Sequence, residues 1–471
     1  MRRSLTAALA VTTLVTPLVL VATAGSASAA PTAPRTPLVD FNHDGYADLA
    51  ISAVGGSGGT TPGHVTVVYG SPAGPDTAHA KTFGRATPGV PGDPEDGGRF
   101  GQETAAADLD GDQYTDLVVT GYDGKPVVLW GSASGLTGEG STETPWKGSH
   151  VTAGDFNGDG KRDLVTAEYP PSEDPMDNDD QGMTISYGPF TRDGKPASTQ
   201  TVVTGQTFGP ADFVAGDITG DGADDIVSSH GFEERAYSSQ FWKGGKDGVA
   251  TTSQKLAASL GGAIADVDKD GYGDLVVRDI GNNYEDMPYQ KGTILVRYGT
   301  PDGPSATRTA KLTQDTAGVP GVGEDGDEFG SSISAGDVNG DGYADIAVGI
   351  PGEDIESVAD AGSTVLLKGS RSGLTGTGAQ AFQQSTAGVP GASEKNDKFG
   401  GQVLLSDTNK DGRADLTVTA PLEDGTYADS GAAWHLRGSA SGLTVTGITS
   451  FGPKALGLSE NRVEFGGGLT R

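Results

Sequence analysis

Short apolar runs separated by glycine-rich turns recur along almost the whole chain. One run is Leu49–Val54, and a second is His64–Tyr69, which ends at Gly70. Runs rich in β-branched residues, with turn signals roughly every 8–12 residues, are typical of antiparallel β-structure. No long segment shows the helical period of an amphipathic helix. We therefore predict an all-β chain.

A nine-residue phrase, Asp-x-(Asp/Asn/Thr)-x-Asp-Gly-x-x-Asp, precedes the strands and occurs seven times, with Gln113 replacing the Gly in the second copy. We call each copy an Asp loop and number its positions 1 to 9. The loops begin at Asp40, Asp108, Asp155, Asp217, Asp266, Asp337 and Asp407. Such self-similarity marks an array of units that cannot bury their apolar faces alone. Seven units of about four strands each predict a seven-bladed β-propeller.

The repeats divide residues 30–471 into seven blades and a closing segment. We place the blades at about 36–98, 99–147, 148–206, 207–255, 256–326, 327–396 and 397–451, and the closing segment at 452–471. Phe-Gly pairs precede several Asp loops, whereas the pair Phe465-Gly466 has no Asp loop after it. We expect this C-terminal tail to complete the first blade and close the ring, because that blade would otherwise present an unpaired strand edge.

Residues 1–29 have the pattern of a secretory signal peptide. Arg2 and Arg3 precede an apolar stretch, and small residues end at Ala29. The stretch is too short and too close to the N-terminus to be preferred as a membrane span. We therefore expect a secreted, extracellular protein that does not insert into a membrane. Ordinary secretion is favoured over a twin-arginine route.

The chain is strongly acidic and contains no cysteine. Its formal net charge is -31, and self-repulsion at that level opposes a compact state. An exported protein without disulfides needs another source of stability. Nucleic-acid binding is excluded as a function class, because it requires a basic stripe.

The order of motifs points to a known family. A Phe-Gly pair, an Asp loop and then Ala347–Pro351 or Val418–Pro421 resemble the FG-GAP repeats of integrin α-subunit propellers and their secreted bacterial relatives. The best matches are residues 329–351 and 399–421. The resemblance implies a seven-bladed propeller with calcium in the hairpin between the first and second strands of a blade. It also implies that partners bind at the opposite face.

The residues of the Asp loop suit calcium. This cation takes about 6–8 oxygen ligands, which side chains at positions 1, 3, 5 and 9 and the carbonyl at position 7 can supply, while Gly at position 6 permits a sharp turn. The candidate ligands are, loop by loop, Asp40, Asn42, Asp44, Tyr46 and Asp48; Asp108, Asp110, Asp112, Tyr114 and Asp116; Asp155, Asn157, Asp159, Lys161 and Asp163; Asp217, Thr219, Asp221, Ala223 and Asp225; Asp266, Asp268, Asp270, Tyr272 and Asp274; Asp337, Asn339, Asp341, Tyr343 and Asp345; Asp407, Asn409, Asp411, Arg413 and Asp415. Magnesium fits less well, and zinc and copper are disfavoured without Cys or His ligands.

Not every copy is equally complete. Gln113 replaces Gly in the second loop, and Thr219 is a weaker ligand in the fourth. Because Asx turns form without a cation, some copies could have kept the turn and lost the metal. The sequence therefore predicts several structural calcium ions, between two and seven.

The sequence assigns no catalytic or cofactor-binding residue. The segment Gly55–Gly59 matches Gly-x-Ser-x-Gly, but no helix follows it as a nucleophile elbow requires. The six histidines are scattered and form no metal-spaced pair. An enzyme would need residues that converge only in space.

Acidic, aromatic loops between the second and third strands should lie opposite the Asp loops. They are Glu168–Asp180, Phe232–Tyr237, Tyr284–Tyr289, Glu353–Glu356 and Glu423–Tyr427. They form either a solvated surface or a recognition face with exposed tyrosine anchors. We favour a monomeric, calcium-binding module for binding or adhesion whose partner is an extracellular protein or glycan. The alternatives are an extracellular hydrolase or lyase with its site in the funnel, and a purely structural surface protein.

Overall fold

The described strands form seven four-stranded antiparallel sheets within the compact unit of residues 31–471. The computed structural model describes residues 38–54, 62–93, 98–121, 124–148, 150–167, 182–206, 208–232, 234–460 and 463–470. The predicted signal peptide and the segment Gly55–Gly59 lie outside these ranges. Each sheet is one blade, and we number the blades by the Asp loops that they contain.

In every blade the strands are paired in simple order from first to fourth. Blade one contains β28 (Gly468–Leu469), β1 (Leu49–Ala53), β2 (His64–Tyr69) and β3 (Asp76–Phe83). Blade two contains β4 (Thr104–Ala107), β5 (Asp116–Val119), β6 (Val127–Leu129) and β7 (Thr142–Glu143). Blade three contains β8 (Val151–Gly154), β9 (Asp163–Ala167), β10 (Gly182–Tyr187) and β11 (Ser198–Val203).

The remaining four blades follow the same plan. Blade four contains β12 (Asp212–Gly216), β13 (Asp225–Phe232), β14 (Arg235–Trp242) and β15 (Gln254–Lys255). Blade five contains β16 (Ser259–Ala265), β17 (Asp274–Asp279), β18 (Ile294–Arg297) and β19 (Thr309–Leu312). Blade six contains β20 (Ile333–Gly336), β21 (Asp345–Ile350), β22 (Ser363–Lys368) and β23 (Thr375–Phe382), and blade seven contains β24 (Gln402–Ser406), β25 (Asp415–Ala420), β26 (Ala432–Ser439) and β27 (Gly442–Phe451).

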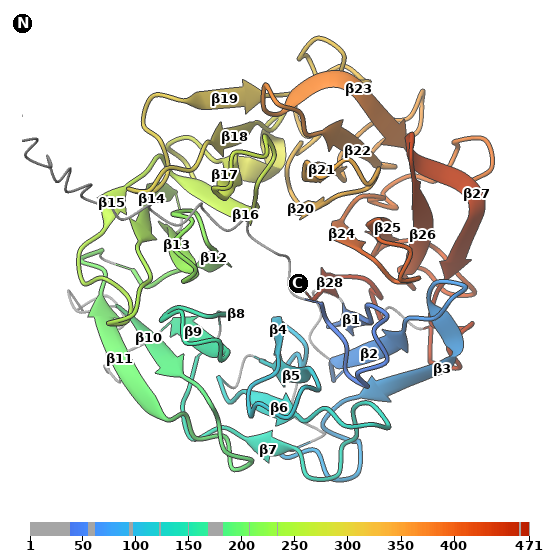
Figure 1. Ribbon diagram of the computed structural model, residues 1–471. Helices are drawn as coiled ribbons and strands as arrows, with labels where there is room; N and C mark the ends of the chain where they lie inside the picture. Colours follow the sequence, from blue (N-terminus) through green and yellow to red (C-terminus); the bar gives the residue numbers. More distant parts are fainter. Residues whose placement is uncertain are drawn as a thin grey trace, which may run out of the picture. The chain divides into compact units, whose positions relative to one another are not determined.

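The seven sheets are arranged as a closed ring (Figure 1). The first strands of the blades lie nearest the centre, and the fourth strands lie at the rim. First strands of successive blades contact one another in the order β4, β8, β12, β16, β20, β24 and β28. A hydrogen bond of 2.6 Å between the hydroxyls of Thr470 and Thr104 joins blade one to blade two. The predicted all-β, seven-bladed propeller is therefore confirmed.

The C-terminal tail closes the ring as predicted. In β28, Leu469 pairs with Ile51 and Gly468 pairs with Ser52 of β1. The backbone N–H of Gly466 also donates to the carbonyl of Ser52 at 3.0 Å. The last strand in sequence thus becomes the first strand of blade one, which removes the edge that β1 would otherwise expose.

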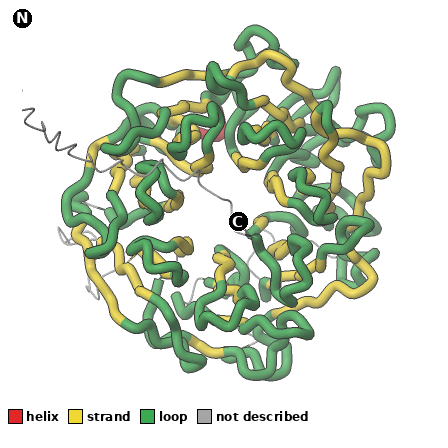
Figure 2. The backbone as a smooth tube through the Cα atoms, in the orientation of Figure 1, coloured by secondary structure: helices red, strands yellow, loops and turns green. Residues whose placement is uncertain are grey.

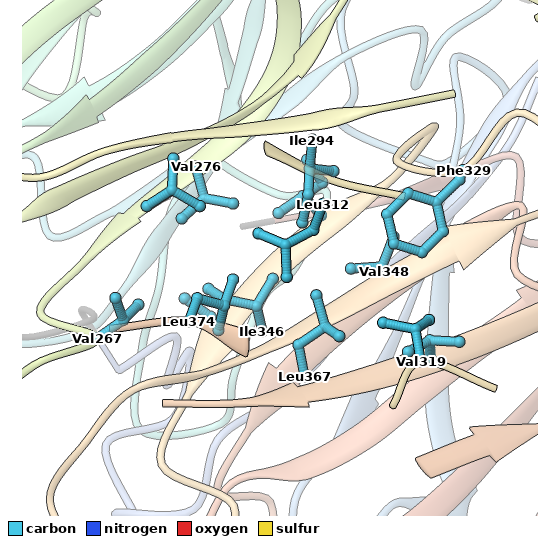
Figure 3. Packing of buried hydrophobic residues seen from close by; sticks show 14 of the residues in the cluster. Val267, Val276, Ile294, Leu312, Val319, Phe329, Ile346, Val348, Leu367 and Leu374 are labelled. Carbon is cyan, nitrogen blue, oxygen red and sulfur yellow. The ribbon is translucent and has the colours of Figure 1, made fainter. Parts of the chain in front are cut away.

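The central strands of each blade are buried on both faces. Every residue of β21 is buried, whereas four of the six residues of rim strand β11 are exposed. This difference explains the sequence pattern, because a strand covered on both faces reads as a continuous apolar run. Between blades five and six, side chains such as Val276, Ile294 and Ile346 belong to one buried apolar cluster that also contains Phe329 (Figure 3).

The Phe-Gly pairs have a packing role at the blade junctions. Phe100, Phe329, Phe399 and Phe465 are at most 2% exposed and belong to apolar clusters. The Gly that follows each has a φ between 90° and 99°, which favours glycine. A Cβ on Gly400 would also lie 2.1 Å from the carbonyl oxygen of Ser363.

Helical structure is minimal in the described part of the chain. A single 3-10 turn, η1 (Met287–Tyr289), is present, and the remaining connections are loops and turns (Figure 2). Among the described residues, no helix has the length and apolarity needed to cross a bilayer.

Candidate metal centres

Each Asp loop precedes the second strand of its blade, and in blades two to seven it joins the first strand to the second. Neighbouring loops are hydrogen-bonded to one another around most of the ring. In six adjacent pairs, the backbone N–H at position 8 donates to the backbone carbonyl at position 1 of the preceding loop. These bonds run from Ala47 to Asp407 (3.1 Å), Thr115 to Asp40 (3.0 Å), Asp224 to Asp155 (2.7 Å), Gly273 to Asp217 (3.1 Å), Ala344 to Asp266 (3.1 Å) and Ala414 to Asp337 (2.8 Å). The loops therefore lie together, and we call this side of the propeller the Asp-loop end.

Within a loop, the acidic side chains fold back on their own turn, as the sixth loop illustrates. The Oδ2 atom of Asp337 accepts the N–H of Gly342 at 2.8 Å. The Oδ1 atom of Asn339 accepts the N–H of Asp341 at 2.8 Å, and Oδ1 of Asp341 accepts the N–H of Tyr343 at 3.0 Å. These bonds orient the oxygens of positions 1, 3 and 5 along one turn.

Position 6 has the left-handed backbone that the sequence predicts. Its φ is 85° at Gly45 and 83° at both Gly342 and Gly412. Gln113 occupies this position in the second loop and still adopts a φ of 78°. Its N–H donates to Oδ2 of Asp108 at 2.9 Å, as the glycines do in other loops. The second loop therefore keeps the turn although a bulkier residue replaces Gly.

The aspartate at position 9 has a second role that the sequence did not reveal. In the sixth loop, Oδ2 of Asp345 accepts the N–H of Val338 at 3.2 Å, and Oδ1 accepts the N–H of Gly369 at 3.0 Å. Asp345 is fully buried. It thereby ties the start of the loop to the end of the third strand. The first five loops repeat this arrangement.

A recurrent glycine could have indicated this contact. Gly369 follows the third strand of its blade within two residues, as Gly70 and Gly299 do in theirs. A Cβ on Gly369 would lie 2.3 Å from the carbonyl oxygen of Ala344. The position is therefore restricted to glycine by the close approach of the Asp loop.

In the first six loops, burial raises the pKa of the position 9 carboxyl well above the ordinary value for aspartate. Desolvation is the largest cause, and the neighbouring loop aspartates act in the same direction. The pKa is raised to about 6 at Asp163, about 7 at Asp48, Asp116, Asp225 and Asp345, and about 8 at Asp274. In each case the ionised form is disfavoured unless a positive charge is brought close.

Two loops bring three carboxylates close together. Within the described residues, these groups are Asp108, Asp110 and Asp112, and Asp266, Asp268 and Asp274, with ligand atoms within 4.8 Å of one another. They occur in the only two loops with Asp at position 3. Such all-oxygen sets could hold a hard divalent cation.

The fourth and seventh loops differ from the other loops in the contacts of their polar side chains. In the fourth, the Oγ1 atom of Thr219 is buried and has no hydrogen-bond partner. In the seventh, Asn409 donates its amide to Asp415 at 3.0 Å, and Thr408 donates its hydroxyl to the same carboxylate at 2.8 Å. Asp415 therefore has more side-chain donors than its counterparts.

The loops between second and third strands lie at the opposite end, because strands in an antiparallel sheet alternate in direction. Tyr289 and Tyr427 are 76% and 56% exposed there. Tyr284 is partly buried, so it is less suited to anchor a partner. Its ring packs against Gly231, where an added Cβ would lie 2.1 Å from the ring. The predicted acidic loop Glu168–Asp180 lies outside the described residues.

Two histidines have a lowered pKa. Burial lowers the pKa of His64 and of His230 to about 4. Both rings are therefore neutral at physiological pH. His230 contacts the hydroxyl of Ser228 at 2.9 Å, and the indole N–H of Trp242 donates to the same hydroxyl at 3.0 Å. This arrangement is a buried packing network.

The blades and their Asp loops define a class of protein, the repeat-built β-propeller. Residues 35–68, 329–367 and 399–436 match the FG-GAP repeat family, and residues 108–166 match the FG-GAP-like repeat. The chain is therefore an FG-GAP repeat protein, which confirms the resemblance found in the sequence.

The similar curated proteins are much longer. The chain is 28% identical over 163 residues to phosphatidylinositol-glycan-specific phospholipase D of Rattus norvegicus, and 28% identical over 161 residues to the enzyme of Mus musculus. These alignments include 35% and 34% of this chain but 18% of each relative. The similarity thus spans under a fifth of the length of these relatives.

Solved structures resemble the chain more distantly. AofleA from Arthrobotrys oligospora has a TM-score of 0.38 at 11% identity, covering 74% of this chain and 85% of that one. BBS1N in complex with ARL6DN has a TM-score of 0.34 at 10% identity, covering 76% and 99%. The architecture described here therefore stands on this chain's own strand order.

Proposed function

We propose that the protein is a secreted β-propeller that binds several structural calcium ions and acts as an extracellular binding or adhesion module. The observation that supports calcium most directly is the donor set of the Asp loops. Positions 1, 3, 5 and 9 supply oxygen atoms alone, with positions 1, 3 and 5 on one tight turn and position 9 at or next to the start of the second strand. Calcium is the hard cation that accepts such a set with flexible geometry.

A bound cation would also stabilise loop groups that lack a hydrogen-bond partner or a favourable environment. The buried hydroxyl of Thr219 has no hydrogen-bond partner, although buried polar groups are almost always satisfied. Burial also raises the pKa of Asp345 to about 7. A cation beside these groups would provide the missing contact and favour the ionised carboxylate.

The structural role follows from the position of the loops. Each loop is hydrogen-bonded to a neighbour around most of the ring, and position 9 fixes it to the third strand. When bound, calcium would neutralise carboxylates that otherwise repel one another within a strongly acidic chain. We expect each ion to stabilise its own loop and, through the shared hydrogen bonds, the adjacent blade.

Recognition of a partner is assigned to the opposite end. Tyr289 and Tyr427 are exposed in loops of blades five and seven, and Val322 is 67% exposed in the connection between blades five and six. Exposed aromatic side chains are frequent binding anchors. Asp286 and Asp424 lie in the same two loops. A basic protein surface or an uncharged glycan therefore suits this end better than an acidic glycan.

The test is capture of extracellular ligands by the full chain on protein and glycan arrays, with calcium and with a chelator. The double variant Tyr289→Ala/Tyr427→Ala should lose capture and keep the melting temperature of the wild type in calcium. Val203→Ala, a change at an exposed apolar residue on rim strand β11, is the matched control. Capture that persists in the double variant would contradict this assignment of the binding face.

A further inference from the structure

Among the described residues, an arginine pairs with positions 3 and 5 in two Asp loops, the second and the fifth. A third arginine, Arg162, pairs only with position 8 of the fourth loop, Asp224, at 3.4 Å. In the second loop, Arg192 pairs through Nε with Oδ2 of Asp110 and through Nη2 with Oδ2 of Asp112 at 2.6 Å. In the fifth loop, Arg308 pairs through Nη2 with Oδ2 of Asp268 and through Nη1 with Oδ2 of Asp270 at 3.1 Å. In both cases one guanidinium bridges positions 3 and 5.

The two arginines reach this arrangement from different places in the fold. Arg192 belongs to blade three and reaches the loop of blade two, whereas Arg308 belongs to the same blade as its loop. Each guanidinium also lies over an aromatic ring that ends the third strand of the loop's own blade. The distance from Cζ to the ring centroid is 4.9 Å for Trp130 and 4.0 Å for Tyr298.

The arginines occupy the oxygens that a metal ion needs. In these two loops, Oδ1 of positions 3 and 5 accepts backbone N–H groups of the loop itself. The Oδ2 atoms are the ones left for an ion, and they are the atoms that Arg192 and Arg308 hold. In each of the two loops, a bound cation and the guanidinium therefore compete for the same two carboxylate oxygens.

Other loops provide a comparison. Position 3 is Asn in the first, third, sixth and seventh loops and Thr in the fourth. Lysines pair with position 5 alone in the third and fourth loops, where Lys161 is 3.6 Å from Asp159 and Lys243 is 3.1 Å from Asp221. In the first, sixth and seventh loops, no ion pair joins a position 3 or 5 side chain to another described residue.

We infer that Arg192 and Arg308 act as internal competitors of calcium, so that the second and fifth loops load at a higher calcium concentration than the first, sixth and seventh. This inference rests on the proposed calcium binding. The extra carboxylate at position 3 and the arginine cancel in charge, and Lys269 lies at position 4, so the fifth loop is no more negative than the sixth. Calcium must in addition displace two charge-assisted hydrogen bonds in the fifth loop, and the sixth requires no such step.

The competition also predicts where the two arginine side chains lie once calcium is bound. Each stays beside its aromatic ring when the carboxylates turn to the ion, because stacking on Trp130 or Tyr298 does not depend on the Asp loop. Partial loading would therefore produce two populations of blades. Blades one, six and seven would be held at low calcium, and blades two and five would be held only as calcium rises.

Calcium titration of the metal-free full chain against a chromophoric chelator tests the inference. The wild type should show a tight class and a weaker class of sites. Arg308→Gln should move one site from the weaker class to the tight class by lowering its calcium Kd about tenfold. A hydrogen bond between charged groups in a partly exposed site contributes on that order. Arg192→Gln should move a second site in the same way.

The matched controls separate competition from other effects. Lys311→Gln removes the neighbouring ion pair with Asp279, at 2.6 Å, which does not involve an Asp loop, and it should leave every site unchanged. Asp268→Asn/Arg308→Gln gives the fifth loop the same side chains at positions 1, 3, 5 and 9 as the sixth and should bring its affinity close to that of the sixth loop. Arg308→Lys should lie between the wild type and Arg308→Gln and is available if the glutamine variant folds poorly.

The outcomes distinguish the two proposals. If calcium binds and Arg308→Gln leaves its site unchanged or weaker, the arginine supports the site and the competition is refuted. If no loop binds calcium in the wild type, the proposed function fails and the competition fails with it. Melting curves in saturating calcium check that each variant is folded.

Discussion

At the Asp-loop end of the propeller the same turn repeats from blade to blade, whereas the loops at the opposite end differ in length and sequence. The first end has little freedom, because position 9 is buried and tied to the third strand, as at Asp345 and Gly369. The second end presents solvent-exposed side chains such as Tyr289 and Tyr427. The contrast indicates that one end maintains the ring, and the other is free to vary for recognition.

Removing calcium should produce the largest effect, because it acts on the whole Asp-loop end at once. Each ion that binds only the folded state adds about 1.4 kcal/mol at tenfold saturation. Several ions together rival the total stability of a domain, roughly 5–15 kcal/mol. Excess chelator should therefore lower the melting temperature sharply, as measured by calorimetry. An unchanged melting curve would show that the Asp-loop end is stable without metal.

Substituting position 9 should separate its clamp from its role as a ligand. In chelator, Asp345→Ala leaves the buried N–H groups of Val338 and Gly369 without acceptors, at about 1–3 kcal/mol each. Asp341→Ala, at an exposed position of the same loop, should change stability little in chelator and lower it in calcium. Urea denaturation measures both. Equal effects of the two variants in chelator would contradict the clamp.

The opposite end should contribute a smaller, pH-dependent effect. Burial, with the nearby Asp327 and Asp397, raises the pKa of Glu353 and of Glu423 to about 7. Between the ordinary value for glutamate and pH 7, the folded protein retains protons that the unfolded chain has released. The free energy of unfolding therefore falls as pH rises through this window.

This dependence can be measured in saturating calcium by melting at pH 5 and pH 8. Glu353→Gln/Glu423→Gln should lose less stability than the wild type on going to pH 8, by a few degrees, and should differ little from it at pH 5. Glu324→Gln, at an exposed position nearby, should behave as the wild type. A double variant that loses as much stability as the wild type would refute the assignment.

The exposed tyrosines should have the smallest effect on stability. Tyr289→Ala and Tyr427→Ala remove side chains that are largely in solvent, and such changes usually alter stability by about 0.5 kcal/mol or less. Tyr284→Ala should be more destabilising, because its ring packs on Gly231. Thermal melts of the three single variants rank them. Equal destabilisation by all three would remove the distinction between packed and free aromatics at this end.

Much of the fold could be predicted from the sequence because its signals are local and repeated. The seven Asp loops fixed the number of blades, and the unpartnered Phe465-Gly466 pointed to the strand that pairs with Ile51. A repeat unit shows the same spacing in every copy, and the missing part of one copy can be read from the others.

The candidate sites could be predicted only in part. The loop turn follows from the repeated pattern, and Gln113 adopts it although the other loops have Gly at this position. Contacts between distant segments do not. Arg192 lies 80 residues from Asp112 in sequence, and the acceptor role of Asp345 toward Gly369 depends on where the third strand ends. The packing of Tyr284 on Gly231 likewise arises between neighbouring blades. The sequence around Tyr284 therefore could not show that this tyrosine is packed whereas Tyr289 is exposed.

The central claim is that the Asp loops are calcium sites that hold the blades in a ring, and the metal content of the protein tests it most directly. The purified full chain would be saturated with calcium, passed through metal-free buffer and analysed by mass spectrometry for bound elements. The account predicts several calcium ions per chain, reduced in number when Asp337 and Asp341 are replaced by Ala. The absence of stoichiometric calcium from the folded, saturated protein would contradict it.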